Sequence, residues 1–361
     1  MTLGGLPDFP WDSLAAAKEV AAAHADGIVD LSIGTPVDPV PELVRAALCG
    51  PAAAEPGYPY TWGTPALRAA VVAAMDRRFG VGGIDPDAVL PTIGSKELVA
   101  WLPTLLGLGA GDVVAIPELA YPTYEVGARL AGADVVRLAA GEPLPAGTRL
   151  LWLNSPSNPT GAVLPAESMR AVVDAAREAG AVVASDECYL AFSTGSSVLH
   201  RSVSGGRHDG LIAVHSLSKS SNLAGYRAGF VTGDAKLVRT LMELRRHAGM
   251  IVSRPVQAAM CAALDDDEHI AEQAARYSSR RARLRVGLRA FGLTVEHSAA
   301  GLYLWATGAE PGRVTVDRLA KLGVLVAPGE FYGPAGASYI RVAATAHDYR
   351  IDAAVQRLSA G

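Results

Sequence analysis

The sequence predicts an α/β fold with a mostly parallel sheet and a smaller α/β domain at the C-terminal end. Short apolar segments alternate with longer helical patterns over most of the chain, and strands joined by helices are typical of parallel sheets. Half of the 361 residues are hydrophobic, which is enough for a large core. We expect residues 1–35 to form an arm and helix that join the smaller domain, residues 36–250 the large domain, and residues 251–361 the smaller domain.

The first half of the chain carries the strands and helices of the large domain. An Ala-rich helix is expected over 12–25, and a loop through Gly34 precedes a second helix that starts at Glu42. The strands are short and apolar, as strands buried on both faces are. The other expected elements are helix 65–78, strand 89–93, helix 94–106, strand 112–116, a helix from Tyr121, strand 134–138, strand 150–153, helix 165–179 and strand 182–185.

The second half starts with an apolar strand at 211–214 and then becomes mostly helical. The acidic run 265–268 is interpreted as a helix start, where carboxylates offset the helix dipole, and the arginines of 276–289 as a solvated helix face. The expected elements are helices 235–250, 254–264 and 268–291, strands 301–305, 324–327 and 339–342, helix 315–322 and a helix from Asp348.

Charge and cysteine content exclude several classes of protein. A net charge of -4 gives no reason to expect nucleic acid or an anionic membrane as a partner. No apolar stretch reaches the length of a membrane span, and the first residues lack the pattern of a signal peptide. The cysteines Cys49, Cys188 and Cys261 are far apart and lack metal-ligand spacing. We therefore expect a cytoplasmic protein without a metal site.

Lys219 is the residue around which the candidate site is organised. It follows the apolar strand at 211–214, stands beside the hydroxyls of Ser216 and Ser218, and precedes Arg227 by eight positions. Hydroxyls and a guanidinium beside an amine form an anion site next to a nucleophile. Such a site is suited to a Schiff base with pyridoxal phosphate, because desolvation and cationic neighbours keep a lysine nucleophilic.

Other polar segments also follow expected strands. Gly94, Ser95 and Lys96 open a helix after strand 89–93, where free backbone N–H groups favour an anion, although an ordinary helix start gives the same pattern. The segment 154–161 could be a plain turn, since it is rich in Asn, Pro and Gly. Ligands in parallel sheets bind where strands end, and each of these segments lies at a strand end.

In order and spacing, these segments resemble the class I/II aminotransferases, enzymes of pyridoxal-phosphate fold type I. The resemblance covers nearly the whole chain, and it implies that the large domain binds pyridoxal 5′-phosphate. The motifs that carry it are Tyr58, Gly94-Ser95-Lys96, Tyr121, Asn158-Pro159-Thr160-Gly161, Asp186 with Tyr189, Lys219 with Arg227, and Arg341.

The resemblance also implies the chemistry around the cofactor ring. Lys219 would hold the cofactor and act as general base on the substrate's α proton. Asp186 would pair with the protonated ring nitrogen, so that the ring accepts electrons from the α carbon. Asn158 and Tyr189 would contact the phenolic oxygen, and Tyr121 would stack on the ring.

The remaining implied roles concern the phosphate and the substrate. Arg341 would hold the substrate α-carboxylate with its planar guanidinium, together with Gly34 and Asn158; Arg254 or Lys96 is the alternative for that carboxylate. Tyr58, or Tyr60 in its place, would reach the phosphate of a second subunit, which implies a homodimer. The phosphate ligands within one chain would be Ser95, the amide of Lys96, Ser216, Ser218 and Arg227.

A finer resemblance is to the actinobacterial succinyldiaminopimelate aminotransferases. It rests on segments 31–39, 154–157, 221–230 and 328–334. It implies transamination between glutamate and N-succinyl-2-L-amino-6-oxoheptanedioate, a step in the synthesis of lysine and of cell-wall diaminopimelate. No residue in these segments gives a physical reason for that substrate.

Three alternatives stay open at the level of sequence. An aminotransferase for aspartate, alanine or an aromatic amino acid would keep every residue above and change only pocket contacts. A carbon–sulfur lyase of the same fold would keep Lys219 but eliminate from the β carbon. A regulator's effector module would bind the cofactor without turnover, and it is disfavoured because both ends of the chain are expected to belong to the fold.

Overall fold

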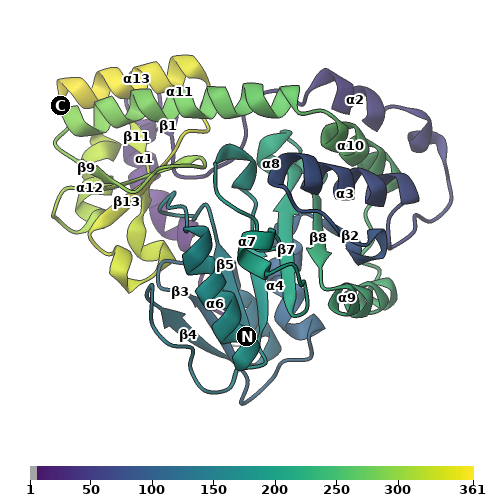
Figure 1. Cartoon of the computed structure of the whole chain (residues 1–361). Helices are drawn as coiled ribbons and strands as arrows, with labels where there is room; N and C mark the ends of the chain where they lie inside the picture. Colours follow the sequence, from purple (N-terminus) through teal and green to yellow (C-terminus); the bar gives the residue numbers. More distant parts are fainter. Residues whose placement is uncertain (1–5) are drawn as a thin grey trace.

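The large part of the molecule is built on a seven-stranded mixed sheet (Figure 1), in a computed structural model that describes residues 6–361. The strand order is β2-β8-β7-β6-β5-β3-β4, and only β8 runs antiparallel to its neighbours. The expected α/β fold with a mostly parallel sheet is therefore confirmed. The strands are β2 (Val89–Ile93), β3 (Val113–Pro117), β4 (Asp134–Leu138), β5 (Thr148–Asn154), β6 (Val182–Asp186), β7 (Leu211–Ser216) and β8 (Ala228–Gly233).

Helices cover both faces of this sheet, because its strands are apolar on both sides. In β7, Leu211 and Ala213 belong to one buried cluster, whereas Ile212 and Val214 belong to the other. The first face is covered by α2 (Glu42–Leu48), α3 (Pro65–Phe79), α6 (Ala166–Glu178), α7 (Arg201–Ser204) and α10 (Arg254–Asp265). The second face is covered by α4 (Ser95–Leu105), α5 (Thr123–Ala131) and α9 (Ala235–Ala248).

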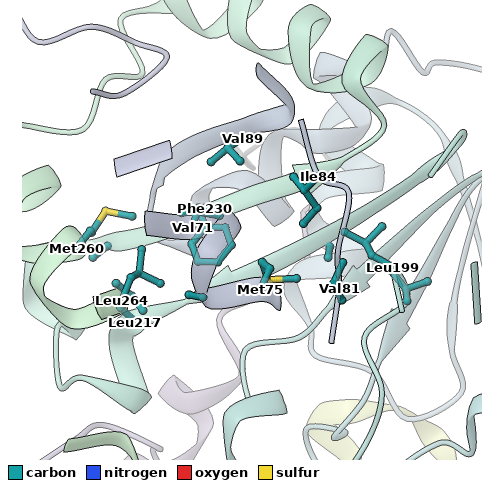
Figure 2. Close-up of a cluster of buried hydrophobic side chains, with 14 of the residues drawn as sticks. Val71, Met75, Val81, Ile84, Val89, Leu199, Leu217, Phe230, Met260 and Leu264 are labelled. Carbon is teal, nitrogen blue, oxygen red and sulfur yellow. The ribbon is translucent and has the colours of Figure 1, made fainter. Parts of the chain in front are cut away.

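The first of these clusters connects α3 and α10 with β8. Figure 2 shows Val71 and Met75 of α3 beside Phe230 of β8, with Met260 and Leu264 of α10 at one side. Met75 has no exposed surface and Phe230 keeps 3%. Burying side chains of this size stabilises the fold by about 1.5–3 kcal/mol each. This packing fixes β8, the strand that follows the candidate lysine loop.

The carboxyl ends of β5, β6 and β7 lie together at one edge of the sheet. Asn154 at the end of β5 pairs in register with Asp186 at the end of β6, and Asp186 pairs with Val214 of β7. The short helix α8 (Leu217–Ser220) begins directly after β7. Parallel strands therefore deliver the segments after Asn154, Asp186 and Ser216 to the same place.

The C-terminal part has a second core around a four-stranded antiparallel sheet, β12-β13-β10-β9. A parallel pair, β1 with β11, joins the N-terminal arm to this part of the molecule. Its elements are α1 (Ala15–Ala22), β1 (Val29–Asp30), α11 (Glu268–Ala290), β9 (Thr294–Glu296), β10 (Tyr303–Thr307), α12 (Gly312–Lys321), β11 (Val324–Leu325), β12 (Ala327–Pro328), β13 (Tyr339–Ala343) and α13 (Asp348–Ala360).

Two expectations from sequence differ from the structure here. The single strand expected over 324–327 is two short strands, because β11 pairs with β1 whereas β12 pairs with β13. The strands β1 and β9 were not anticipated, since two or three residues give no recognisable period. The 3-10 helices are η1 (Pro10–Leu14), η2 (Pro51–Ala54), η3 (Pro86–Ala88), η4 (Leu190–Phe192), η5 (Ala224–Tyr226), η6 (Gly329–Tyr332) and η7 (Pro334–Gly336).

The long helix α11 runs across both parts of the molecule, with α13 alongside it (Figure 1). Interpreting all its arginines as a solvated face is wrong for Arg280, which keeps only 1% of its surface exposed. Both terminal nitrogens of Arg280 donate to Asp38 at 2.7 Å, and Gln273 donates to the same carboxylate at 2.9 Å. Asp38 lies in the loop that follows Gly34, so α11 holds this loop in place. Within residues 6–361, no helix is both long and apolar enough to cross a membrane.

We expect Arg280→Met to lower the free energy of unfolding by about 3–5 kcal/mol, because it leaves Asp38 buried without its charge partner. Urea denaturation followed by circular dichroism measures this change. Arg276→Met is the matched control: Arg276 lies one turn earlier, 4.0 Å from the same carboxylate, and is 46% exposed. Its loss should cost under about 1 kcal/mol. Equal losses in the two variants would contradict an anchoring role for Arg280.

Candidate active site

The start of α4 presents free backbone N–H groups. The N–H groups of Ser95, Lys96 and Glu97 have no hydrogen-bond acceptor within residues 6–361, and Gly94 precedes them with a φ of 71°. A Cβ atom on Gly94 would lie only 2.8 Å from Cζ of Arg227. The turn therefore requires glycine, and its N–H groups and helix dipole favour an anion.

Arg227 approaches this turn from the β8 side. It adopts a left-handed conformation with a φ of 58°, and its Nη1 donates to the carbonyl of Ala224 at 2.8 Å. Gly229 allows β8 to pack closely, because a Cβ atom there would lie 3.1 Å from the nitrogen of Ser95. Partial burial, and then the charge of Arg227, lower the pKa of Lys96. No carboxylate of the described residues pairs with Arg227 or Lys96, which leaves their charges for a ligand.

Lys219 lies in α8, and Ser216 caps the N-terminus of this helix. The hydroxyl of Ser216 accepts a hydrogen bond from the backbone N–H of Ser218 at 3.1 Å, and both serines are buried. The ammonium of Lys219 donates to the carbonyl of Gly34. Burial, followed by the charges of Arg341 and Arg227, lowers the pKa of Lys219 to about 8, although Cys188 opposes the shift. About a tenth of this amine is therefore neutral and nucleophilic at pH 7, whereas a lysine with an ordinary pKa near 10.4 would be neutral in under about a thousandth of the molecules.

Asp186 is a buried carboxylate whose two oxygens are held by neutral donors. Its Oδ2 accepts from the phenol of Tyr124 at 2.8 Å, and its Oδ1 accepts from the backbone N–H of Cys188 at 3.2 Å. Burial raises the pKa of Asp186, while the hydrogen bonds from Cys188 and Tyr124 and the charge of His215 oppose the rise. A cationic ring nitrogen is the partner that such a carboxylate needs.

Arg341 lies in β13 with 2% of its surface exposed, and it has no carboxylate partner among the described residues. Its Nη1 donates to Oδ1 of Asn158 at 2.9 Å, and its Nη2 donates to the carbonyl of Ser32 at 2.7 Å. Its guanidinium lies 4.1 Å from the ring centroid of Tyr303 and 5.0 Å from that of Tyr332. Neutral contacts position this cation without neutralising it, so that its charge is available to a substrate carboxylate.

Sequence reasoning missed Tyr303, which connects several of these groups. Its hydroxyl lies 3.1 Å from that of Tyr189, and a Cβ atom on Gly34 would lie 2.9 Å from Cε1 of its ring. Gly34 therefore has no room for a side chain. The sequence offered one signal for Tyr303, namely a tyrosine within an otherwise apolar strand. The hydroxyl of a buried tyrosine needs a hydrogen-bond partner, so such a residue points to a polar neighbour.

Tyr121 and Tyr124 stand at the start of α5. The two rings meet edge to face with centroids 5.8 Å apart, and burial raises the pKa of Tyr121 to about 12. Tyr121 therefore stays a neutral aromatic surface beside Asp186. Tyr124 was also missed as a site residue. It lies in the first turn of α5, whereas Tyr121 lies two residues before that helix begins.

Tyr58 is the predicted site residue that the structure does not bring into this cluster. Its surface is 93% exposed, and that of Tyr60 is 69% exposed. Arg254 donates to the carbonyl of Tyr58 at 3.1 Å and pairs with Glu55 at 2.8 Å. These contacts already engage the guanidinium of Arg254, whereas Arg341 has only neutral partners among the described residues.

The donor set fits one kind of cofactor. The α4 turn with Arg227 suits a phosphate, Lys219 suits an aldehyde, and Asp186 suits a basic ring nitrogen. The family model of class I and II aminotransferases matches residues 26–358. The chain belongs to this family. It is therefore an aminotransferase of pyridoxal-phosphate fold type I, and its cofactor is pyridoxal 5′-phosphate, as the sequence predicted.

Similar proteins agree on the family and differ in the activity that their names state. The chain is 60% identical to a probable aminotransferase of Mycobacterium tuberculosis, over 98% of this chain and 85% of that protein. It is 54% identical to the 4-dedimethylamino-4-oxo-anhydrotetracycline transaminase OxyQ of Streptomyces rimosus, over 98% and 99% of the two chains. The structure of a probable N-succinyldiaminopimelate aminotransferase from Thermus thermophilus matches with a TM-score of 0.87 at 28% identity, over 98% of this chain and 100% of that one.

The lowered pKa of Lys219 predicts how fast pyridoxal phosphate attaches to the cofactor-free protein. Only the neutral amine attacks an aldehyde, so the rate should rise with pH and level off above about 8. A lysine with an ordinary pKa near 10.4 would keep gaining rate up to about pH 10. Borohydride trapping at timed intervals, with peptide mapping of Lys219, measures this rate. A rate still rising tenfold per pH unit at pH 9 would contradict the assignment.

Proposed function

We propose that this aminotransferase transfers an amino group between glutamate and N-succinyl-2-L-amino-6-oxoheptanedioate, in the synthesis of lysine and diaminopimelate. The structure of a probable N-succinyldiaminopimelate aminotransferase from Thermus thermophilus supports this proposal, because it matches 98% of this chain. The main support for this proposal is the positive charge of the candidate site. Arg341 and Lys96 have no carboxylate partner among the described residues, and both proposed substrates carry more than one carboxylate.

The bound cofactor supplies an aldehyde that takes the amino group and a ring that draws electrons from the substrate's α carbon. Arg341 orients the α-carboxylate, and Asn158 fixes the guanidinium of Arg341. Lys219, neutral in part near pH 7, would take the proton from the α carbon of the amino acid and, in the reverse half-reaction, return a proton to the α carbon of the keto acid. Asp186 would keep the ring nitrogen protonated, and Tyr121 would stack on the ring.

A transaminase for a large polycyclic ketone is the second candidate. The 54% identity with the Streptomyces rimosus enzyme favours it. Aromatic side chains also gather beside Arg341, where the ring of Trp11 lies 5.3 Å from that of Phe331 and 5.9 Å from the guanidinium. A flat polycyclic substrate would stack well against such rings.

A screen of keto acids and ketones with glutamate as donor distinguishes the two candidates. For the succinylated keto acid we expect a kcat/KM at least about tenfold above those for oxaloacetate, pyruvate and phenylpyruvate, since buried polar groups discriminate strongly between substrates. Turnover of an aromatic tetracyclic ketone without turnover of the succinylated acid would support the second candidate. A preference for oxaloacetate, pyruvate or phenylpyruvate would contradict both.

Arg341 should serve both half-reactions, because both amino acids and both keto acids carry an α-carboxylate. We expect Arg341→Lys to raise the activation free energy of each half-reaction by about 2–5 kcal/mol, since an ammonium cannot make the paired planar contacts. Single-turnover kinetics with glutamate and with the succinylated substrate measure the two losses. A loss confined to the succinylated substrate would assign Arg341 to a distal carboxylate instead.

We also propose that the active unit is a homodimer in which Tyr58 reaches the phosphate of the other subunit. The exposure of Tyr58 supports this arrangement. Tyr58→Phe should weaken cofactor affinity by about 1.5–3 kcal/mol, the range for a hydrogen bond to a charged group.

Mixing tests whether Tyr58 acts across subunits. A hybrid of Tyr58→Phe and Lys219→Ala chains contains one site with both native residues if Tyr58 serves the other subunit. Activity at limiting cofactor should then exceed the sum of the separate variants. If Tyr58 served its own chain, the hybrids would gain nothing over the Tyr58→Phe protein.

A further inference from the structure

A buried ion pair lies directly behind the α4 turn. Glu97 is the third residue of α4, and Arg245 comes from the last turn of α9. Nη1 of Arg245 donates to Oε1 of Glu97 at 2.6 Å, and Nη2 donates to Oε2 at 2.9 Å. Arg245 has no exposed surface, whereas the side chain of Glu97 keeps 16%. This paired contact joins two helices through residues that are 148 positions apart in the sequence.

The carboxylate of Glu97 also fixes the backbone that leads into the turn. Its Oε2 accepts a hydrogen bond from the N–H of Ile93 at 3.2 Å, just before Gly94. The carbonyl of Met250 lies 3.5 Å from Nη2 of Arg245, which ties the end of α9 to the same place. Glu97 and Arg245 therefore support the turn from outside, and neither is needed as a direct phosphate ligand.

The charge of Glu97 alone would work against an anion at this position. The first turn of a helix attracts a phosphate because its N–H groups and dipole are positive, and a carboxylate in that turn offsets this potential. The effect is large where water is partly excluded, because like charges interact more strongly there. Arg245 neutralises the carboxylate through two hydrogen bonds, which leaves the turn positive.

We propose that Arg245 is a positioning residue of the cofactor site, which keeps the α4 turn receptive to the cofactor phosphate by neutralising Glu97. The inference deepens the proposed function, since it rests on the α4 turn as the phosphate site. Because the side chain of Arg245 is fully buried behind Glu97, it would act through Glu97 and not by contact with cofactor or substrate. The pair therefore sets affinity for the phosphate group and leaves recognition of the ring unchanged.

The test uses the cofactor-free full-length protein and two probes that form no bond with Lys219. Pyridoxamine phosphate carries the phosphate and pyridoxamine lacks it, so the ratio of their dissociation constants reports on the α4 turn. Fluorescence titration or calorimetry measures both constants. A wild-type ratio near one would refute the phosphate site itself, and with it the inference. If the wild-type protein binds pyridoxamine phosphate much more tightly than pyridoxamine, the phosphate site is supported. The variants then decide the role of Arg245.

Four variants separate a charge effect from a packing effect. Arg245→Met should weaken pyridoxamine phosphate about tenfold to hundredfold, because it exposes the turn to the charge of Glu97, and leave pyridoxamine within about threefold. The double variant Glu97→Gln/Arg245→Met should return to within about threefold of wild type, since no buried charge remains. Arg245→Lys, which keeps the charge, should bind nearly as wild type. Arg246→Met removes the exposed neighbour that pairs with Glu243, and it should change nothing.

The double variant keeps the test decisive if Arg245→Met folds poorly, because it carries no unpaired charge. Recovery in the double variant with weak binding in Arg245→Met supports the proposal. So does native affinity in both the double variant and Arg245→Lys when Arg245→Met is unfolded. Equal weakening of both probes, or a double variant as weak as Arg245→Met, would overturn it and leave Arg245 as a packing residue.

Discussion

Three buried or half-buried cations, none with a carboxylate partner within residues 6–361, determine the arrangement of this site. Lys219, Arg227 and Arg341 stand around one edge of the sheet, and the two arginines both lower the pKa of the lysine. Charges of like sign are costly to hold together away from water. In the site that we propose, two anions would relieve that cost, the phosphate at Arg227 and the substrate carboxylate at Arg341. The same repulsion that disfavours the empty site therefore favours both ligands and keeps the amine reactive.

The protein holds these cations with neutral groups and reserves ion pairs for the supporting structure. Arg341 is positioned by an amide, a carbonyl and aromatic rings. Arg280 and Arg245, in contrast, each meet a carboxylate through two hydrogen bonds. These two paired arginines anchor a loop and a turn, whereas Arg341 keeps a charge that we propose binds a substrate.

The sequence predicted the fold, and it also singled out most of the residues that the structure gathers in the candidate site, because both rest on local features. Lys219, Asp186 and Asn158 each follow an apolar strand, so a short segment contains both the position and the chemistry. Tyr303 could not be found in this way, because its partner Tyr189 is 114 positions away and no period marks the pair. Arg280 was misread for the same reason. Its helical spacing suggests a solvated face, and only the folded chain brings Asp38 against it.

A transaminase must accept two different side chains at one site, and the structure divides that task between two parts of the chain. The α-carboxylate and the α proton are common to both substrates, and in the proposed site they would meet Arg341 and Lys219, which the sheets hold in place. We propose that the parts that differ between substrates lie farther out, near the N-terminal arm, where Nζ of Lys96 lies 5.7 Å from the ring centroid of Phe9. Relatives with different substrates can therefore share every residue at the strand ends. We therefore propose that the choice of substrate depends on side chains outside the strand ends, such as those of the N-terminal arm, where a residue can change without disturbing the chemistry.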